Sequence, residues 1–281
     1  MIEVDGLTFA YPSAGAETLH GLSFAIEEQE IFGFLGPSGA GKSTTQKILI
    51  GLLHGYAGQA TVMGKEVRDW GHAYYEHVGV SFELPNHHER LTARENLAHF
   101  GALYARETVP VEEVLSWVGL DDAADRRVSD FSKGMKIRLN VARSLLHRPK
   151  LLFLDEPTSG LDPVNARNVK DLVRRVRDQG TTVFVTTHDM AVADQLCDRV
   201  AFITDGRIRA LGAPDALKKK HGRRVVRVEV EGGEVIERPL DGLADDEVFQ
   251  RVLREARVET IHSQETTLEN VFIEVTGEAL T

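Results

Sequence analysis

The stretch Gly36-Pro37-Ser38-Gly39-Ala40-Gly41-Lys42-Ser43-Thr44 fits the P-loop pattern G-x-x-x-x-G-K-[S/T]. Apolar residues 31–35 predict a buried strand that runs into this loop, and residues 44–53 predict the helix that follows it. Glycines let backbone N–H groups converge on one point, and the start of the helix adds partial positive charge there. The stretch therefore predicts a phosphate-binding loop. The plainer alternative is a glycine-rich turn that only joins strand to helix.

The loop gives separate tasks to its members. Lys42 is expected to reach the β- and γ-phosphates of a bound nucleotide, and the Ser43 hydroxyl is expected to ligate Mg²⁺. The other residues of the loop are expected to contact the nucleotide: Gly36, Pro37, Ser38, Gly39, Ala40, Gly41 and Thr44.

A second candidate element is the apolar run at residues 151–154, which ends in the carboxylates of Asp155 and Glu156. Carboxylates at the end of a buried strand are costly without a cation nearby. Asp155 therefore suits indirect or water-mediated binding of the Mg²⁺ held by Ser43, and Glu156 could polarise an attacking water as a general base. A helix-capping acid is the alternative, but an Asp-Glu strand end downstream of a P-loop favours the catalytic interpretation.

Two further side chains have two interpretations each. Tyr11, in a loop after an N-terminal β run, could stack on an adenine ring or cover a small core. His188 follows the β-branched strand 181–187 and could hydrogen-bond a γ-phosphate, or it could cap the next helix at residues 190–196. The residues by themselves leave both pairs of interpretations open.

Composition limits the class of protein. The 281 residues are 42% hydrophobic and 27% charged, as in globular domains that fold in water. The net charge of −10 argues against a nucleic-acid partner and against electrostatic attraction to an anionic membrane. The single cysteine, Cys197, excludes an intrachain disulfide and is expected to be buried, which agrees with a reducing, cytosolic setting. No apolar run is long enough to span a bilayer, so a role at a membrane requires a partner chain.

The order of the patterns predicts two domains. Residues 1–212 are expected to form an α/β domain, with an antiparallel β part near the N-terminus and a helical insertion at about residues 86–145. Residues 213–281 are expected to form a small α+β appendage, in which we find no catalytic constellation.

Within these domains some local patterns are specific. Thr92 and Glu95 have the spacing of a helix capping box, and a helix is expected at residues 137–146. The pair His87-His88 is interpreted as part of a solvated loop rather than a metal site, because no further ligand pattern follows it. The basic run at residues 218–224 is interpreted as a solvated helix end and linker.

The motifs, in this order and spacing, resemble those of the nucleotide-binding subunit of an ABC transporter over roughly residues 1–212. In that family the P-loop is called Walker A, and residues 151–156 correspond to the Walker B strand. Residues 131–135 resemble the signature loop and residues 159–162 the D-loop, while His188 matches the switch histidine. Tyr11 matches the adenine-stacking position. The signature variant and the tail at residues 266–272 resemble those of ABC-2-type exporters.

This resemblance implies a P-loop NTPase fold of the ABC type and an ATPase that uses ATP and Mg²⁺, with Lys42, Glu156 and His188 as its catalytic residues. It also implies that two chains, most simply a homodimer, bind head to tail around two ATP molecules. Four residues would then act in trans: Ser132, Lys133, Gly134 and Asp162. Closure and opening of the dimer would power export through a multi-span membrane permease encoded as a separate chain. The subunit would be cytoplasmic and peripheral on the inner face of the cell membrane.

Two positions depart from the family pattern. Glu83 stands where the family usually has Gln, in the loop that couples nucleotide to the membrane subunit; a carboxylate there can contact Mg²⁺ but adds negative charge near the phosphates. Lys133 replaces a glycine of the usual L-S-G-G-Q signature, where it could add charge to the phosphate contact or point into solvent.

Two other functions agree less well with the sequence. A non-transport ABC ATPase acting on ribosomes or DNA usually has two cassettes, long coiled coils or zinc modules, whereas this chain has one cassette, no heptad run and one cysteine. A small-molecule kinase is disfavoured by the loop at residues 131–135 upstream of the Asp-Glu strand. The cargo is not readable here, since its specificity would lie in the permease.

Overall fold

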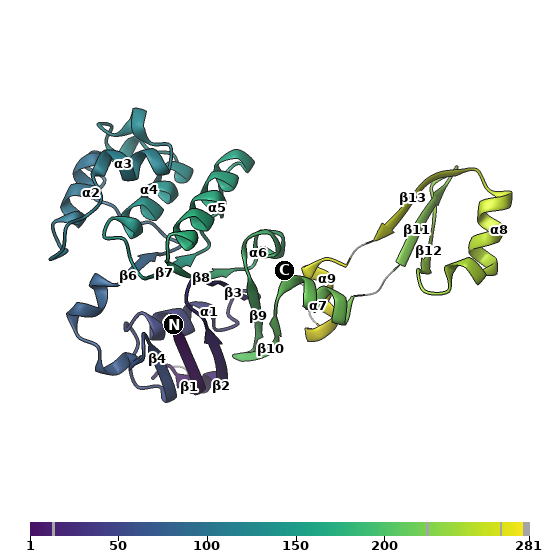
Figure 1. The fold of residues 1–281 in the computed structure, drawn as a ribbon, viewed down its shortest axis with the longest axis horizontal. Coiled ribbons are helices and arrows are strands. Elements are labelled where there is room, and N and C mark those ends of the chain that lie inside the picture. The colour runs from purple at the N-terminus through teal and green to yellow at the C-terminus, as the bar shows by residue number, and fades with distance from the viewer. Residues whose placement is uncertain (13–14, 223–224, 265, 278–281) are drawn as a thin grey trace. The chain divides into compact units, whose positions relative to one another are not determined.

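The computed structural model describes residues 1–12, 15–222, 225–264 and 266–277 (Figure 1). The chain divides into two compact units, Met1–Ala213 and Pro214–Ala279, which are described separately. The elements of the first unit are, in chain order, β1 (Ile2–Ala10), β2 (Glu17–Ile26), β3 (Ile31–Leu35), α1 (Lys42–Leu49), β4 (Ala57–Val62), β5 (Lys65–Glu66), β6 (Val78–Ser81), α2 (Ala93–Gly101), α3 (Val111–Trp117), α4 (Lys133–Leu145), β7 (Leu151–Asp155), α5 (Pro163–Asp178), β8 (Thr182–Thr187), α6 (Met190–Leu196), β9 (Arg199–Thr204) and β10 (Arg207–Gly212).

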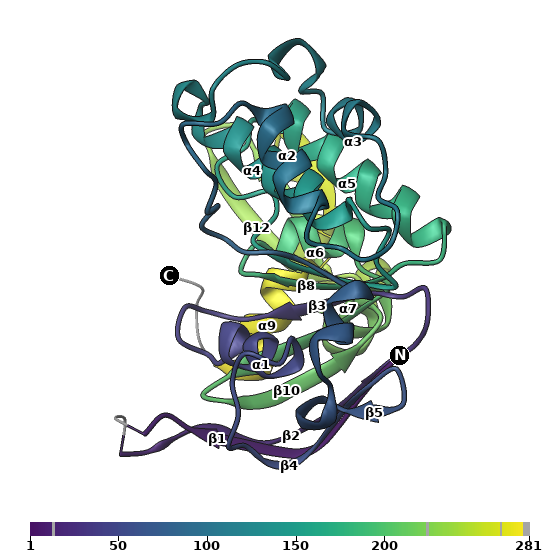
Figure 2. The ribbon, with the colours of Figure 1, turned by 90° about the vertical axis from the view of Figure 1, so that its left-hand side faces the viewer.

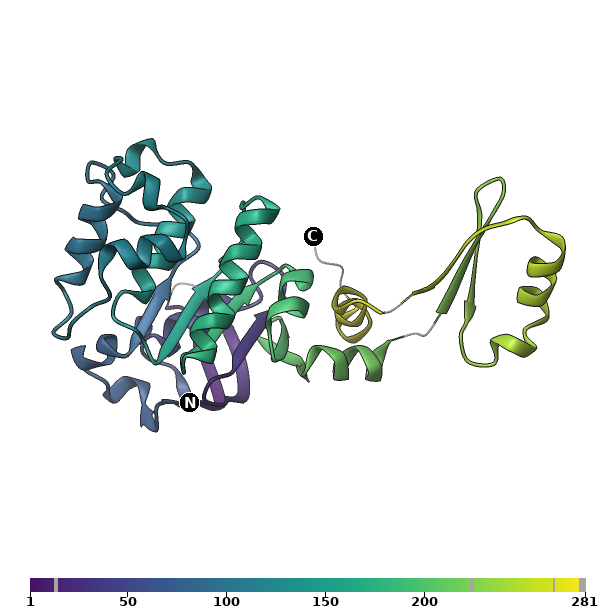
Figure 3. The same ribbon diagram turned by 45° about the horizontal axis from the view of Figure 1, so that its top comes forward.

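Two sheets organise the first unit. One is antiparallel, with the strand order β2-β1-β4-β5. The other has the order β10-β9-β3-β8-β7-β6, in which all neighbours run parallel except the edge strand β10. Helices α2, α3 and α4 gather on the side of the parallel strands that is remote from the antiparallel sheet (Figures 2 and 3). The predicted α/β fold, with its antiparallel and helical parts, is confirmed.

The two sheets share one apolar core. Phe24 of β2 packs on Phe34 of β3 with their ring centroids 5.5 Å apart, and Ile48 and Leu49 of α1 are buried in the same cluster. The central strands are buried on both faces, as expected for parallel strands that helices cover. This packing holds the strand that precedes the P-loop and the helix that follows it in one rigid layer.

Several local expectations can be compared with the structure. The capping box is confirmed, with Thr92 Oγ1 accepting from Glu95 N and Glu95 Oε2 accepting from Thr92 N. Cys197 is buried, as predicted. The expected start of a helix at residue 137 is wrong by one turn, because Ser132 caps α4 and the helix begins at Lys133.

The second unit consists of α7 (Pro214–His221), β11 (Val225–Val230), β12 (Glu234–Pro239), α8 (Glu247–Glu255), β13 (Val258–Gln264) and α9 (Leu268–Thr276). Its antiparallel sheet has the order β12-β11-β13, and the buried residues Val226, Val228 and Val230 face apolar side chains that include Phe249 and Val252 of α8. Part of the basic run forms the last turn of α7, while Arg223 and Arg224 lie outside the described residues. Within the described ranges of both units, every helix is too short or too polar to cross a bilayer.

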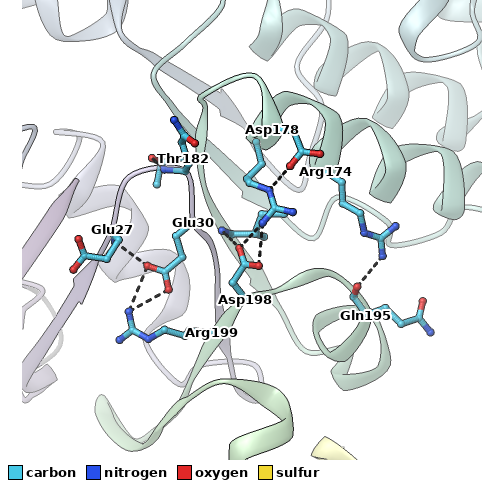
Figure 4. A network of polar contacts seen from close by, with 11 residues as sticks. Glu27, Glu30, Arg174, Asp178, Thr182, Gln195, Asp198 and Arg199 are labelled. Atoms are coloured by element: carbon cyan, nitrogen blue, oxygen red, sulfur yellow. Dashed lines mark hydrogen bonds and ion pairs between the residues drawn. The ribbon is translucent and has the colours of Figure 1, made fainter.

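A polar network fixes the start of β3 (Figure 4). Asp198, just before β9, accepts from Ile31 N at 2.8 Å and from Arg177 of α5 at 3.0 Å. Glu30 accepts from Arg199 at 3.1 Å and from Glu27 N at 2.7 Å. These contacts tie β3 to β9 and to the end of α5, at the end of the sheet opposite the P-loop.

We predict that Asp198→Ala lowers the free energy of unfolding by about 1–3 kcal/mol, because it leaves the buried Ile31 N–H without its acceptor. Urea denaturation of the full chain measures this change. Asp178→Ala is the matched control: it removes only an exposed contact to Arg177 and should cost about 0.5 kcal/mol or less. Equal costs for the two variants would show that the network does not hold β3.

Candidate active site

The ends of β3, β7 and β8 open into a cavity of about 320 Å³. The parallel register sets these ends level, since Leu35 pairs with Thr187 and Asp155 pairs with Thr186. The cavity is lined by residues from three separate predicted motifs: Ser38, Gly39, Gly41, Lys42, Ser43, Thr44, Glu83, Asp155, Glu156 and His188. The sheet therefore brings the P-loop, the Asp-Glu strand end and the predicted switch histidine to one place.

The P-loop needs glycine for two different reasons. Gly41 has a φ of +108°, a left-handed conformation that side chains disfavour. Gly36 lies against β9, where a Cβ atom would sit 2.1 Å from the Ile203 carbonyl oxygen. The backbone can thus curve around a ligand while it packs tightly on the sheet behind it.

The Lys42 side chain closes the loop. It is 9% exposed, and its Nζ donates to the carbonyl oxygens of Gly36 at 2.5 Å and Pro37 at 2.9 Å. Burial lowers the pKa of Lys42, while the negative charges of Glu156, Asp155 and Glu83 oppose that shift. An ammonium group held inside a ring of backbone groups suits a polyphosphate ligand, which would contribute further negative charge to stabilise it.

Oxygen ligands for a divalent cation line the same cavity. They are the Ser43 hydroxyl and the carboxylates of Asp155 and Glu83. Burial raises the pKa of Asp155, and the nearby charge of Glu83 acts in the same direction, whereas a hydrogen bond from Thr186 and the charge of Lys42 lower it. A hard cation with oxygen ligands such as Mg²⁺ fits this set of donors and would keep Asp155 ionised.

Glu156 is held in a strained and well-defined position. Its φ of +50° lies in the left-handed region, which is uncommon for a residue with a side chain. One carboxylate oxygen accepts from Thr187 Oγ1 at 2.9 Å, and the other accepts from His188 N at 2.9 Å and lies 2.7 Å from His188 Nδ1. The catalytic interpretation of Glu156 thus has a supporting geometry.

Other residues cap the helices for which Glu156 and His188 were the alternative capping residues. Asp162 is the N-cap of α5, with its carboxylate accepting from Val164 N and Asn165 N at 3.1 and 3.0 Å. Asp189 is the N-cap of α6. Glu156 and His188 are therefore free of capping roles in α5 and α6, and both line the cavity.

The remaining predicted site residues are not among those that line the cavity. Tyr11 contacts the P-loop, since its hydroxyl lies 3.1 Å from Thr44 Oγ1, but its ring packs edge-on against Phe9 at 4.9 Å. The contact with Phe9 agrees with the interpretation that Tyr11 covers a small core, and stacking of Tyr11 on an adenine ring stays a prediction.

The residues predicted to act in trans form a group apart from the cavity. Ser132 and Lys133 are exposed at the start of α4, and Lys133 runs alongside Gly160 of the D-loop, where an added Cβ would lie 3.3 Å from Lys133 Nζ. Gly134 faces Leu161 of the same loop, and Asp162 is exposed.

Two site residues escaped the sequence-based prediction. The sequence predicts Thr186 and Thr187 as part of a buried β strand, yet the hydroxyl of Thr186 contacts Asp155 and that of Thr187 contacts Glu156. Two polar residues at the end of an otherwise apolar strand, directly before His188, are the signal that could have revealed them.

Comparison with known proteins shows the family to which the chain belongs. The sequence profile of the ABC transporter family matches residues 19–159, and that of the fluoroquinolone efflux ABC transporter C-terminal domain matches residues 224–265. The fluoroquinolones export ATP-binding protein of Mycobacterium tuberculosis (strain H37Rv) is 57% identical over 100% of this chain and 95% of its own length. The daunorubicin/doxorubicin resistance ATP-binding protein DrrA of Streptomyces peucetius is 40% identical over 82% of this chain and 70% of its own.

Solved structures agree. An ATP-binding subunit of an ABC transporter superposes with a TM-score of 0.71 at 28% identity, covering 79% of this chain and 93% of that one. A dimeric ATP-binding cassette in a post-hydrolysis state, bound to ADP and phosphate, gives a TM-score of 0.70 at 25% identity, covering 76% and 98%. The chain therefore belongs to the ABC transporter family. It is an ATP-binding and ATP-hydrolysing subunit that powers export.

We predict that Glu156→Gln keeps ATP binding but lowers hydrolysis by about 10²–10⁴-fold, because the amide cannot accept a proton from water. Phosphate release and equilibrium binding of ATP measure the two effects. Glu83→Gln is the control, since it removes a carboxylate from the same cavity and is expected to retain turnover within about tenfold. Turnover close to wild type in Glu156→Gln would remove Glu156 from the role of base.

Proposed function

We propose that this cavity is the ATPase site and that its residues divide the work as follows. The observation that carries the proposal is the convergence of Lys42, Asp155, Glu156 and His188 on one cavity with the P-loop backbone. Lys42 and the loop N–H groups bind and orient the phosphates. Glu156 accepts a proton from the attacking water, and His188 donates a hydrogen bond toward the γ-phosphate while it contacts Glu156.

The proposed role of Mg²⁺ is to neutralise the charge of the phosphates. Ser43, with Asp155 and Glu83 in the same cavity, would hold Mg²⁺, which would neutralise phosphate charge when bound. Asp155 keeps its carboxylate directed into the cavity through Thr186, and Glu83 adds a second negative group from the loop after β6. Both residues thereby favour nucleotide that arrives together with its metal.

We further propose that the site is completed by a second copy. Ser132, Lys133, Gly134 and Asp162 lie away from the cavity of their own chain, and Ser132, Lys133 and Asp162 are exposed. A head-to-tail homodimer would place the start of α4 and its N–H groups against the nucleotide of the partner. Tyr11 would stack on the adenine ring after its own ring leaves the contact with Phe9.

The membrane partner is proposed to be a separate multi-span permease on whose inner face the subunit sits. The cargo is proposed to be fluoroquinolones, since relatives with 57% identity over the whole chain are named for their export and the C-terminal profile carries the same name. We also propose that residues 1–212 form the ATPase domain, with the helical part at about 86–145, and that residues 213–281 form an accessory domain. The division into compact units at Ala213 and Pro214 supports this boundary.

Export can be tested in a drug-sensitive bacterial host that produces this chain together with the membrane protein that co-purifies with it from its native cell. Wild type is expected to lower steady-state accumulation of a fluorescent fluoroquinolone, because ATP turnover drives the cargo out. Lys42→Ala and Glu156→Gln should restore accumulation to that of the host. If accumulation stays unchanged with an ATPase-active wild-type complex, the cargo proposal is wrong while the ATPase proposal stands.

A further inference from the structure

We propose that Thr186 and Thr187 are positioning residues with divided tasks: Thr186 orients Asp155 for the divalent cation, and Thr187 orients Glu156 for attack by water. The inference rests on the proposed roles of Asp155 and Glu156. It assigns to the end of β8 a function that the sequence and the family comparisons leave unassigned.

The strand geometry explains the division. Successive side chains of a β strand point to opposite faces, so Thr186 and Thr187 of β8 diverge. Glu156 follows the last residue of β7 and has a φ of +50°, so its direction is set by this turn rather than by strand alternation. Asp155 pairs directly with Thr186 in the parallel register. Each hydroxyl donates to a different carboxylate, Thr186 to that of Asp155 and Thr187 to that of Glu156.

Thr186 is committed to Asp155. It is 0% exposed, and its Oγ1 donates to Asp155 Oδ1. The other acceptors within reach are farther away, with the Leu154 carbonyl oxygen at 3.4 Å and Gln46 Oε1 at 3.5 Å. A hydroxyl has one proton to donate, and a charge-assisted bond to a carboxylate is the strongest of the three choices.

Thr187 is committed to Glu156 in a different way. It is 1% exposed, and its Oγ1 donates to Glu156 Oε2 at 2.9 Å while it accepts from Asp189 N at 3.0 Å. Because the hydroxyl is used as both donor and acceptor, its orientation is fixed. Thr187 thereby links the carboxylate of Glu156 to Asp189, the N-cap of α6. His188 contacts the other oxygen of that carboxylate.

The test compares Thr→Val, which keeps the shape and loses the hydroxyl, with Thr→Ser, which keeps the hydroxyl, at each position of the full chain. Loss of one hydrogen bond to a charged group predicts effects of about 10–100-fold. Thr187→Val should lower kcat by that factor and leave KM for ATP and the Mg²⁺ dependence within about threefold. Thr186→Val should instead raise the Mg²⁺ concentration needed for half-maximal activity by that factor. At saturating Mg²⁺, kcat should stay within about threefold of wild type. The serine variants should restore each value to within about threefold of wild type.

A binding measurement separates the metal effect from turnover. In the Glu156→Gln background, electron paramagnetic resonance of Mn²⁺ with ATP should show about 10-fold weaker Mn²⁺ binding after Thr186→Val and unchanged binding after Thr187→Val. Added to Glu156→Gln, Thr187→Val should cause no further loss of hydrolysis, since it acts through Glu156. Thermal unfolding checks the fold of each variant, and if a valine variant unfolds, Thr→Ala is used in its place.

The outcomes distinguish a failure of the proposed role of Glu156 from a failure of the proposed roles of Thr186 and Thr187. If Glu156→Gln hydrolyses ATP like wild type, the proposed role of Glu156 fails and this inference falls with it. If Glu156→Gln is inactive but Thr187→Val is fully active, the site proposal stands and this inference is overturned. It is overturned as well if the two valine variants affect kcat and metal binding alike, or if serine fails to restore activity in a folded chain.

Discussion

The site depends on how one buried cation is balanced against the carboxylates around it. The ammonium of Lys42 is confined by the carbonyl oxygens of its own loop, and the carboxylates of Asp155, Glu156 and Glu83 line the same cavity. Negative charge is therefore in excess before any phosphate arrives. A nucleotide triphosphate adds more, so binding needs both the converging N–H groups of the loop and a divalent cation. This excess of negative charge supports the proposal that ATP binds together with Mg²⁺.

That balance requires three strands to end at the same level. Backbone pairing of β3, β7 and β8 sets this level, and the Asp198 and Glu30 contacts secure β3 at its other end. The close approach of Gly36 to Ile203 leaves the P-loop little freedom to shift along the sheet. A change in the register of β7 by one residue would place another residue opposite Thr186 and break the contact of Thr186 with Asp155. Rigidity of the sheet is thus a condition for the arrangement of charges.

The sequence predicted those parts of the fold and site that are local. The P-loop, the Asp-Glu strand end and the Thr92 capping box each lie within a few residues, and their geometry follows from backbone rules. The start of α4 at Lys133 differs from the predicted start because Gly134 lowers the helix propensity of the first turn. The N-cap hydrogen bond of Ser132 stabilises that turn in spite of the glycine.

Contacts made across strands were beyond the reach of the sequence. The pairing of Asp155 with Thr186, and the contacts of the two threonines, depend on which strands become neighbours and in which register. The contact of Gly36 with Ile203 and that of Asp198 with Ile31 have the same origin, since each joins residues that are distant in the chain. Such contacts leave only a weak local trace, here two hydroxyl residues at the end of an apolar strand.

The position of the signature residues supports the proposal that two copies of the chain form a head-to-tail dimer. Ser132 and Lys133 stand at the start of α4, and the D-loop with Gly160 lies directly beside them, so these two loops form one surface. The cavity that holds Lys42 and Glu156 is lined by other residues. In the proposed head-to-tail dimer, these two surfaces of one chain would be complementary half-sites that meet only across the interface. The proposed second copy in head-to-tail orientation would satisfy both at once, and closure of that interface would then depend on the ATP between the two chains.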